Sequence, residues 1–152
     1  MVAQFIASML ATVSFAILYS TPKRHLLYCS ITGALGWIVY LIFKDFGANT
    51  ILCNFASAFS LSIIARIFAV FNQAPVTLYL FPGIIPIVPG AGIYYTAYYF
   101  FMNNMYQSGH FAQDTAKTVL AICFGIIFAM AIPQKLFKVI KKRRKEKWNL
   151  KK

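Results

Sequence analysis

The stretch LYLFPGIIPIVPGAGIYYTAYYFFM, residues 78–102, decides the fold because it is almost wholly apolar and yet breaks its own helical pattern. Three prolines and three glycines fall between positions 82 and 92: Pro82, Gly83, Pro86, Pro89, Gly90 and Gly92. An interior proline lacks the N–H group that a helix needs and costs about 3 kcal/mol. One straight helix will not absorb three of them. The pattern therefore predicts two half-helices joined by an elbow, with a new helix amino terminus near positions 90–92.

The hydrocarbon of a bilayer limits what can surround this elbow. In hydrocarbon, an unpaired backbone N–H or C=O group costs several kcal/mol, so non-helical backbone survives only where protein or a water-filled cavity covers it. We therefore expect the elbow to face a polar site at bilayer depth. The simpler alternative is a kink that lets the segment pack, with no ligand nearby.

The composition of the whole chain is that of a membrane protein. Of its 152 residues, 60% are hydrophobic and 12% are charged, and the mean hydropathy is +0.66. We predict an all-α, polytopic integral membrane domain over residues 1–134, followed by a basic tail over residues 135–152. Apolar stretches near the length that crosses a bilayer predict five spans, at about 2–21, 26–43, 49–71, 76–102 and 117–134.

Basic residues predict the orientation of these spans. An odd number of spans places the two ends of the chain on opposite sides of the membrane. With the amino end outside, the cytoplasmic side receives thirteen of the fifteen Lys and Arg residues, namely Lys23, Arg24, Arg66 and ten in the tail. The other two, Lys44 and Lys117, each lie near an Asp. The positive-inside rule favours this arrangement, so we expect a multi-pass plasma-membrane protein with a cytoplasmic carboxyl end.

The tail, KLFKVIKKRRKEKWNLKK, supplies most of the net charge of +12. Because it directly follows a predicted span, its Lys and Arg side chains should meet anionic lipid headgroups, at a gain of about 1 kcal/mol each near the surface. A tail that binds a cytosolic partner or nucleic acid is the less favoured alternative, and we do not expect nucleic acid as a partner.

Two stripes of small residues at four-residue intervals predict where spans pack. They lie in the first and the fifth spans: Ala3, Ala7 and Ala11, and Ala121, Gly125 and Ala129. Small side chains let helix backbones approach closely, so both stripes are predicted to be packing faces, and they leave homo-oligomers open.

The third predicted span is unusually polar. Asn54, Ser62 and Arg66 recur at multiples of four, with Ser57 between them, and form a ribbon that should face protein or water. We include all four in a candidate pathway. Arg66, near the cytoplasmic end, is either a topology anchor that snorkels, or a contact for an anionic substrate or for a carboxylate of another subunit.

Aromatic residues follow the elbow, and most of them fit the belt that Tyr and Trp form at a membrane interface. Tyr94 and Tyr95, the nearest to the elbow, carry hydroxyl groups that could line a pathway. The segment MNNMYQSGHFAQDT, residues 102–115, is predicted to form an external loop.

Enzyme chemistry has no visible residues in the sequence. No Asp or Glu falls within a predicted span, no nucleotide-phosphate loop is present, and no Ser, His or Cys constellation suits nucleophilic catalysis. The three cysteines lie in separate spans and are interpreted as small apolar residues, Cys29 among them. Both histidines, His25 and His110, are expected in loops on opposite sides of the membrane, so no metal site or cofactor is predicted.

The string FPGIIPIVPGAGIYY, residues 81–95, resembles the signature of the threonine/serine exporter family, in particular of its small membrane domain. The resemblance in organisation extends over nearly the whole chain. In that family a long form fuses two five-span halves, and a bipartite form divides them between a larger subunit and a small subunit of about this size. The chain is similar to the small subunit.

The resemblance implies secondary export of small amino acids such as threonine and serine, driven by the proton motive force, or of dicarboxylates such as succinate. It implies a larger membrane subunit as partner, which would supply the coupling acid that the predicted spans lack. The prolines and glycines of the elbow carry over as the family's motif positions. A half-helix amino terminus suits a carboxylate, at about 0.3 to 2 kcal/mol. Two other functions stay open: a non-transporting membrane scaffold or assembly factor that acts through the basic tail, and a channel-like pore.

Overall fold

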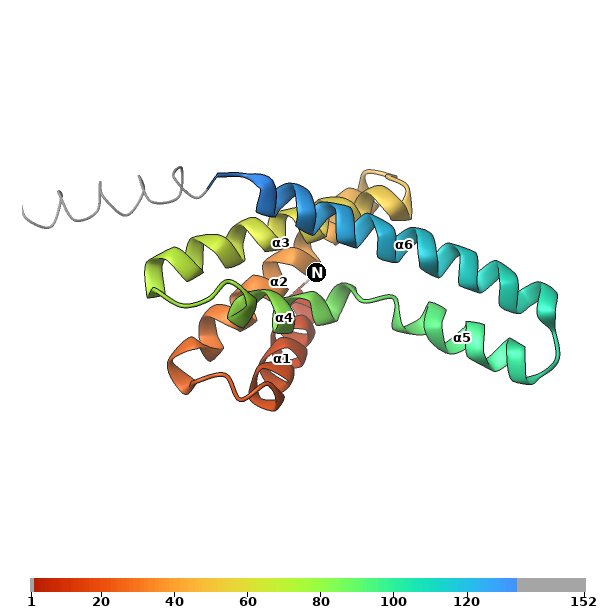
Figure 1. Cartoon of the computed structure of the whole chain (residues 1–152), viewed down its shortest axis with the longest axis horizontal. Helices are drawn as coiled ribbons and strands as arrows, with labels where there is room; N and C mark the ends of the chain where they lie inside the picture. The colour runs from red at the N-terminus through yellow and green to blue at the C-terminus, as the bar shows by residue number, and fades with distance from the viewer. Residues whose placement is uncertain (1, 134–152) are drawn as a thin grey trace, which may run out of the picture.

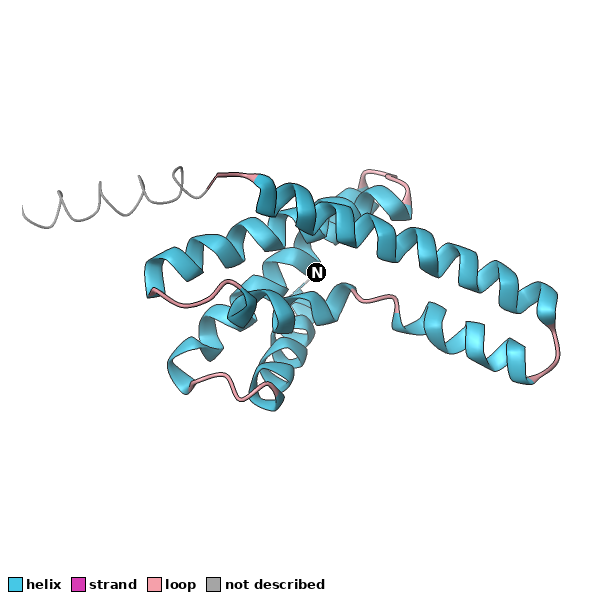
Figure 2. Cartoon of the chain, in the orientation of Figure 1, coloured by secondary structure: helices cyan, strands magenta, loops and turns pink. Residues whose placement is uncertain are grey.

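The computed structural model describes residues 2–133, and these form helices and turns without any strand (Figure 2). In chain order the elements are α1 (Val2–Leu18), α2 (Lys23–Asp45), α3 (Thr50–Asn72), α4 (Thr77–Ile84), the 3-10 turn η1 (Ile85–Ile87), α5 (Gly90–Phe101) and α6 (Met105–Ala131). The all-α prediction is confirmed for this part of the chain. The tail predicted at residues 135–152 lies outside the described residues.

Helices α2, α3 and α6 are each long and apolar enough to cross a membrane. They have 23, 23 and 27 residues, and a bilayer core requires about 20. Helix α3 packs between the other two (Figure 1). These contacts are close: a Cβ atom on Gly125 of α6 would lie 2.7 Å from the Phe55 carbonyl oxygen of α3. On the other side of α3, the Ser57 hydroxyl donates a hydrogen bond of 2.7 Å to the Gly36 carbonyl of α2.

The two predicted stripes of small residues differ in outcome. In α6, Ala121, Gly125 and Ala129 are all buried, which confirms that stripe as a packing face. In α1, Ala3 and Ala7 are exposed and Ala11 is half-buried. The face of α1 that packs is instead formed by Ser8, Thr12 and Ala16, and it lies against Gly33 of α2. Within this chain the prediction for α1 was wrong, because serine and threonine can also line a packing face when each hydroxyl bonds a backbone carbonyl of its own helix.

The predicted break of the fourth segment is confirmed. Helix α4 with η1 and helix α5 form a pair that is bent by 57° at the break. The two halves have different neighbours. Helix α4 packs against α1, α2 and α3, whereas α5 packs only against α6 among the described elements. Helix α5 and the first half of α6 therefore extend from the other helices as a two-helix arm, at the right of Figure 1.

The polar segment expected as a loop at residues 102–115 is helical from Met105 onward, and this prediction was wrong. Helix α6 begins at Met105, and the Asn104 side chain accepts a hydrogen bond of 3.2 Å from the Gln107 N–H, as an N-cap does. The turn before it is tight. Asn103 adopts a left-handed conformation with φ 59°, and the N–H groups of Asn103 and Asn104 bond the Phe100 and Tyr99 carbonyls, which closes the end of α5.

His25 and His110 also lie in helices rather than loops. His25, in the first turn of α2, is 3% exposed, and its Nδ1 atom lies 2.7 Å from the Tyr79 hydroxyl of α4. Arg24 donates a hydrogen bond of 2.9 Å to the other ring nitrogen of His25. The contact between His25 and Tyr79 ties the start of α2 to the first half of the broken segment.

The count of five spans is not confirmed. By length and composition, the described residues contain three helices that can cross a membrane, or four if the bent pair is one span. Helix α1 is apolar but has 17 residues, which makes it shorter than the other candidates.

Candidate functional site

The first proline of the elbow releases a backbone carbonyl that a cysteine satisfies. Pro82 lies inside α4 and supplies no N–H for the carbonyl of Leu78, four residues earlier. The Cys29 thiol of α2 donates a hydrogen bond of 3.3 Å to this carbonyl. Cys29 is fully buried between the helices. The interpretation of Cys29 as only a small apolar residue was therefore incomplete.

The other two prolines release carbonyls that the elbow satisfies by tightening. Pro86 supplies no N–H for the Pro82 carbonyl, which instead accepts a hydrogen bond from the Ile85 N–H. Pro89 supplies none for the Ile85 carbonyl, which instead accepts a hydrogen bond of 3.3 Å from the Val88 N–H. Both are three-residue bonds of the 3-10 type, which narrow the helix. The three carbonyls that the prolines release are thus hydrogen-bonded within the protein, as a membrane interior requires.

A polar cavity of about 530 Å³ lies where the elbow ends and α5 begins, and we call it the elbow cavity. Its walls come from the start of α3, from the elbow and α5, and from α6: Asn49, Thr50, Ile51, Pro89, Gly92, Phe111, Asp114, Thr115, Lys117 and Thr118. Its size falls within the range of about 300 to 1,000 Å³ that is usual for small-molecule sites. Because the first residues of α3 line it, the cavity is level with one end of α3 and not with its middle.

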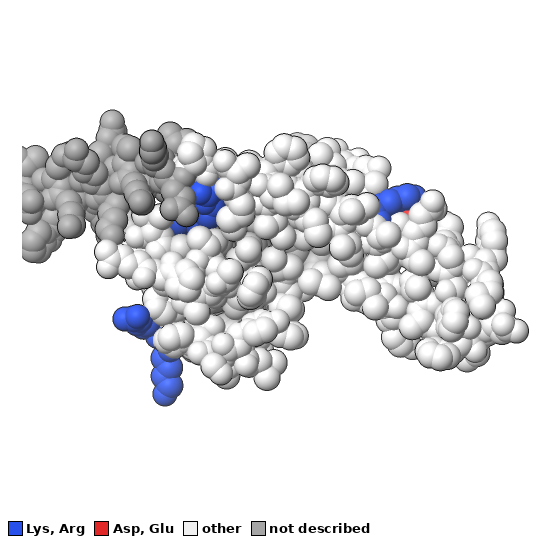
Figure 3. All heavy atoms as spheres, viewed as in Figure 1, with Lys and Arg blue, Asp and Glu red and all other residues white. Residues whose placement is uncertain are grey.

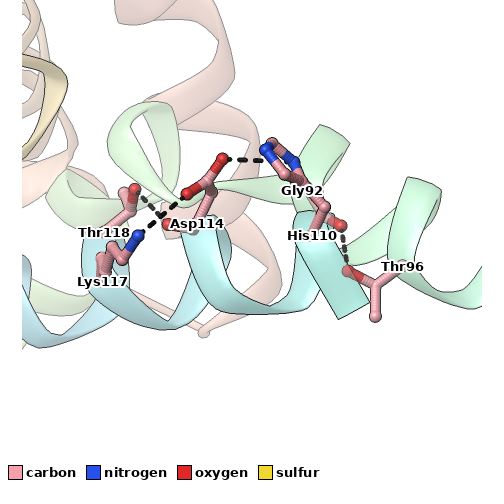
Figure 4. A network of polar contacts seen from close by, with 6 residues as sticks. All are labelled: Gly92, Thr96, His110, Asp114, Lys117 and Thr118. Atoms are coloured by element: carbon pink, nitrogen blue, oxygen red, sulfur yellow. Dashed lines mark hydrogen bonds and ion pairs between the residues drawn. The ribbon is translucent and has the colours of Figure 1, made fainter. Parts of the chain in front are cut away.

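The charges of the elbow cavity come from one face of α6 (Figure 4). The Asp114 carboxylate lies 3.3 Å from the Lys117 Nζ atom and 3.5 Å from the His110 Nδ1 atom. The Thr118 hydroxyl donates a bond of 3.0 Å to the Asp114 backbone carbonyl. The Asp114 and Lys117 side chains are about half exposed, so both are accessible from the cavity and from outside. Asp114 belongs to α6, a helix long and apolar enough to cross a membrane, and the expectation that no acid lies within a span stays a prediction.

Gly92 sets the distance between α5 and α6 at this cavity. A Cβ atom on Gly92 would overlap the Thr115 hydroxyl of α6, and it would lie 3.3 Å from the Thr115 Cβ atom. A Cβ atom on Gly90 would meet nothing within 4 Å. Of the two glycines at the start of α5, only Gly92 is therefore needed for close packing.

The structure divides the predicted motif residues between two places. Pro89 and Gly92 line the elbow cavity, and Gly90 is the first residue of α5 beside it. Pro82 and Gly83 are buried in the core instead, where a Cβ atom on Gly83 would lie 3.2 Å from Thr32. Pro86 is in η1, between these two places.

The predicted polar ribbon of α3 does not line the elbow cavity. Asn54, Ser57, Ser62 and Arg66 are all buried, so the ribbon faces protein. Asn54 and Ser62 bond carbonyls of α3 itself. Arg66 donates to the Ala129 carbonyl and, at 3.2 Å, to the Met130 carbonyl at the end of α6. The contacts of Arg66 with α6 and of Ser57 with α2 hold α3 against its neighbours, and a role of the ribbon in a pathway stays a prediction.

Tyr94 and Tyr95 lie on α5 and are exposed, at 62% and 43%. Neither lines the elbow cavity. Their rings contact each other, and Tyr95 also contacts Phe111 of α6, which does line the cavity. Tyr95 is therefore adjacent to the site, and Tyr94 faces away from the packed side of the arm.

The sequence interpretation missed the residues of α6 and of the start of α3 that form most of the cavity wall. Asp114, Thr115, Lys117 and Thr118 were placed in or beside a loop. The signal that could have found them is Asn104, because Asn before a helical pattern is a strong N-cap residue. Within residues 2–133, no group of three or more His, Cys, Asp or Glu side chains is placed to hold a metal ion.

The comparison with known families extends the resemblance based on residues 81–95. The family model described as Threonine/Serine exporter, ThrE, matches residues 4–132. The match runs from α1 to the end of α6 and includes both the elbow and every residue of the elbow cavity. No solved structure matches the chain.

Proposed function

The chain belongs to the threonine/serine exporter family, and from this premise we propose that it is one subunit of a secondary exporter for small carboxylate-bearing solutes. The family consists of transporters and not of enzymes. Together with the family, the long apolar helices of the chain indicate a multi-pass membrane protein. The solutes that we propose are threonine- and serine-type amino acids, with dicarboxylates such as succinate as the second class.

The observation that carries this proposal is the elbow beside a polar cavity. A kink that served only packing would need no open polar space next to it. Here the amino end of α5 adjoins a cavity that holds a carboxylate, an ammonium group and hydroxyl groups. Transporters build their substrate sites at such discontinuous helices, because the free N–H groups of a half-helix attract anionic groups.

We propose five spans, with α1 as the first and the bent pair as the fourth. Helix α1 is about 26 Å long at 1.5 Å per residue, close to the bilayer core of about 30 Å. We place the amino end outside and the carboxyl end in the cytoplasm. Basic side chains near the end of the molecule where α2 begins support this orientation (Figure 3). The elbow cavity then lies toward the outer face, where an exporter releases its solute.

We further propose that the pathway forms against a larger membrane subunit of the same family. Within the described residues, the elbow cavity lies at the arm and is lined by both an acidic and a basic side chain, and α5 packs only against α6. A second chain would complete the enclosure of a moving solute. Homo-oligomers are the alternative assembly. The basic tail, in this proposal, binds anionic lipid headgroups.

The test is solute efflux from cells or membrane vesicles loaded with labelled threonine and labelled succinate. Efflux is compared between membranes with both chains, with either chain alone, and with neither. The proposal expects saturable efflux of at least one solute that needs both chains and falls when the proton gradient is collapsed. Efflux that does not saturate and survives without the gradient would indicate a pore.

Deletion of residues 141–152 separates an exporter from a scaffold. An exporter should keep its efflux if the shortened chain still inserts, as measured by its amount in the membrane. A scaffold that acts through its tail should lose its function. Loss of efflux with normal insertion would contradict the exporter proposal.

A further inference from the structure

We propose that Asp114 and Lys117 make the elbow cavity a binding site for a small zwitterion, that is, a free α-amino acid. In this site the Asp114 carboxylate binds the ammonium group of the solute, and the Lys117 ammonium group binds its carboxylate. The inference rests on the proposed function and narrows its solute class, because it favours amino acids over dicarboxylates.

The first support is that the cavity carries charges of both signs on one wall. Asp114 and Lys117 are three residues apart on α6 and face the same side of the helix. Both line the elbow cavity, and Figure 4 shows the Asp114 carboxylate between Lys117 and His110. A zwitterion can match both charges at once, whereas an anion matches only Lys117.

The second support is that the two charges are paired with each other, but only weakly. Their distance is 3.3 Å, and both side chains are about half exposed. Exposed pairs of this kind contribute little stability, so a solute can exchange with them at small cost. The pair also keeps the net charge of this cavity wall low, which an isolated charge beside apolar helices would not do.

The third support is the polar lining opposite the charges. Asn49 is the N-cap residue of α3, but its side chain makes no capping hydrogen bond. Asn49 and Thr50 line the elbow cavity from α3, across from Thr115 and Thr118 of α6. These groups can bond a side-chain hydroxyl of the solute.

A dicarboxylate fits this arrangement poorly. One carboxylate can bind Lys117, but the other is then held near Asp114, which has the same charge. Two neighbouring carboxylates repel each other and disfavour binding, unless one of them is protonated. Removing the Asp114 charge should therefore harm amino acids and spare dicarboxylates.

The experiment measures threonine and succinate efflux for Asp114→Asn and Lys117→Gln in the vesicle assay. Asp114→Asn should lower threonine efflux roughly tenfold at subsaturating solute and leave succinate efflux equal or higher. Lys117→Gln should lower both, because both solutes carry a carboxylate. Asp45→Asn and Lys44→Gln remove the same charges from the exposed end of α2, outside the elbow cavity, and should change neither solute.

Competition with the wild-type protein gives a second measurement that needs no substitution. Unlabelled serine should compete with labelled threonine. The compounds 3-hydroxybutyrate, which lacks the amino group, and 1-amino-2-propanol, which lacks the carboxylate, should each compete roughly tenfold more weakly.

Three results overturn the inference while the exporter stands: wild-type export of succinate without threonine, equal loss of both solutes in Asp114→Asn, or equal competition by both analogues and serine. Export of neither solute by the wild type, with both chains inserted, overturns the proposed function itself.

Discussion

A single thiol shows how much of the elbow depends on one side chain. Cys29 and Leu78 are 49 residues apart in the chain, and Pro82 leaves the Leu78 carbonyl without its helical partner. The thiol of Cys29 is a weak donor, but the alternative is a bare carbonyl in an apolar interior. The residue thus stabilises the fold through a hydrogen bond and not only through its small size.

Cys29→Ala should lower stability by about 1 kcal/mol or more, since it leaves the Leu78 carbonyl unsatisfied. Cys29→Ser is the matched control, because it keeps a donor at the same place and should lose less. The measurement is the melting temperature of the purified protein in detergent. Equal loss in both variants would show that the size of sulfur, and not the hydrogen bond, is what matters.

The two glycines at the start of α5 provide a second test at this scale. Gly92→Ala should cost about 1 to 3 kcal/mol and lower efflux, because the new methyl group overlaps Thr115. Gly90→Ala, in open space, should be neutral or slightly stabilising. Thr115→Ala should rescue Gly92→Ala in part, as measured by melting temperature in a double-mutant cycle. Independent effects of the two substitutions would contradict the proposed contact.

At the scale of elements, the two ends of α6 are fixed by different means. Its amino end is held by the tight turn with Asn103 and Asn104, which joins α6 to α5 as an arm. Its carboxyl end is held by Arg66, which is 4% exposed and donates to the last carbonyls of α6. A cation at a helix carboxyl end is also favoured by the helix dipole. Neither predicted role of Arg66 included this contact.

Arg66→Gln should therefore destabilise the packing of α3 on α6, at roughly 1.5 to 3 kcal/mol for the loss of hydrogen bonds from a charged donor. Arg66→Lys should lose less, because it keeps the charge but not the planar group that reaches two carbonyls. The readout is the melting temperature together with the amount of inserted protein. A variant Arg66→Gln that melts like the wild type but exports nothing would instead support a direct solute contact.

At the scale of the whole molecule, the helix ends define two sides. The turn at 19–22 joins the end of α1 to the start of α2, and the turn at 73–76 joins the end of α3 to the start of α4. Both turns lie toward the side of the molecule where α6 also ends (Figure 1). The turn at 46–49 lies at the other end of α2 and α3. If five spans exist, the first two turns are cytoplasmic and the third is external.

Reporter fusions test this arrangement. A fluorescent protein joined to the carboxyl end should fluoresce, because it folds in the cytoplasm, and alkaline phosphatase at the same place should be inactive. A tag at the amino end, and one inserted beside Gly47, should react with an impermeant label on intact cells. Gly47 is exposed and has open space around it, but its φ of 75° favours glycine, so the tag is inserted beside Gly47 and the glycine itself is kept. Both chain ends on one side would exclude five spans.

The sequence by itself determined the all-helical membrane class, the break of the fourth segment and the family. These features depend on local chemistry: apolar composition selects the solvent, and proline removes a backbone donor wherever it stands. The α6 stripe was also readable, because Ala121, Gly125 and Ala129 follow one helix face.

Only the tertiary structure decided which residues meet at the elbow. Pro89 and Gly92 reach a cavity while Pro82 and Gly83 pack in the core, although all four belong to one motif. The 57° bend and the turn at Asn103 bring α6 back along α5, which places Asp114 and Lys117 beside the elbow. The spacing of residues along a chain fixes which faces of a helix they share, but the angle between two helices depends on contacts between distant segments.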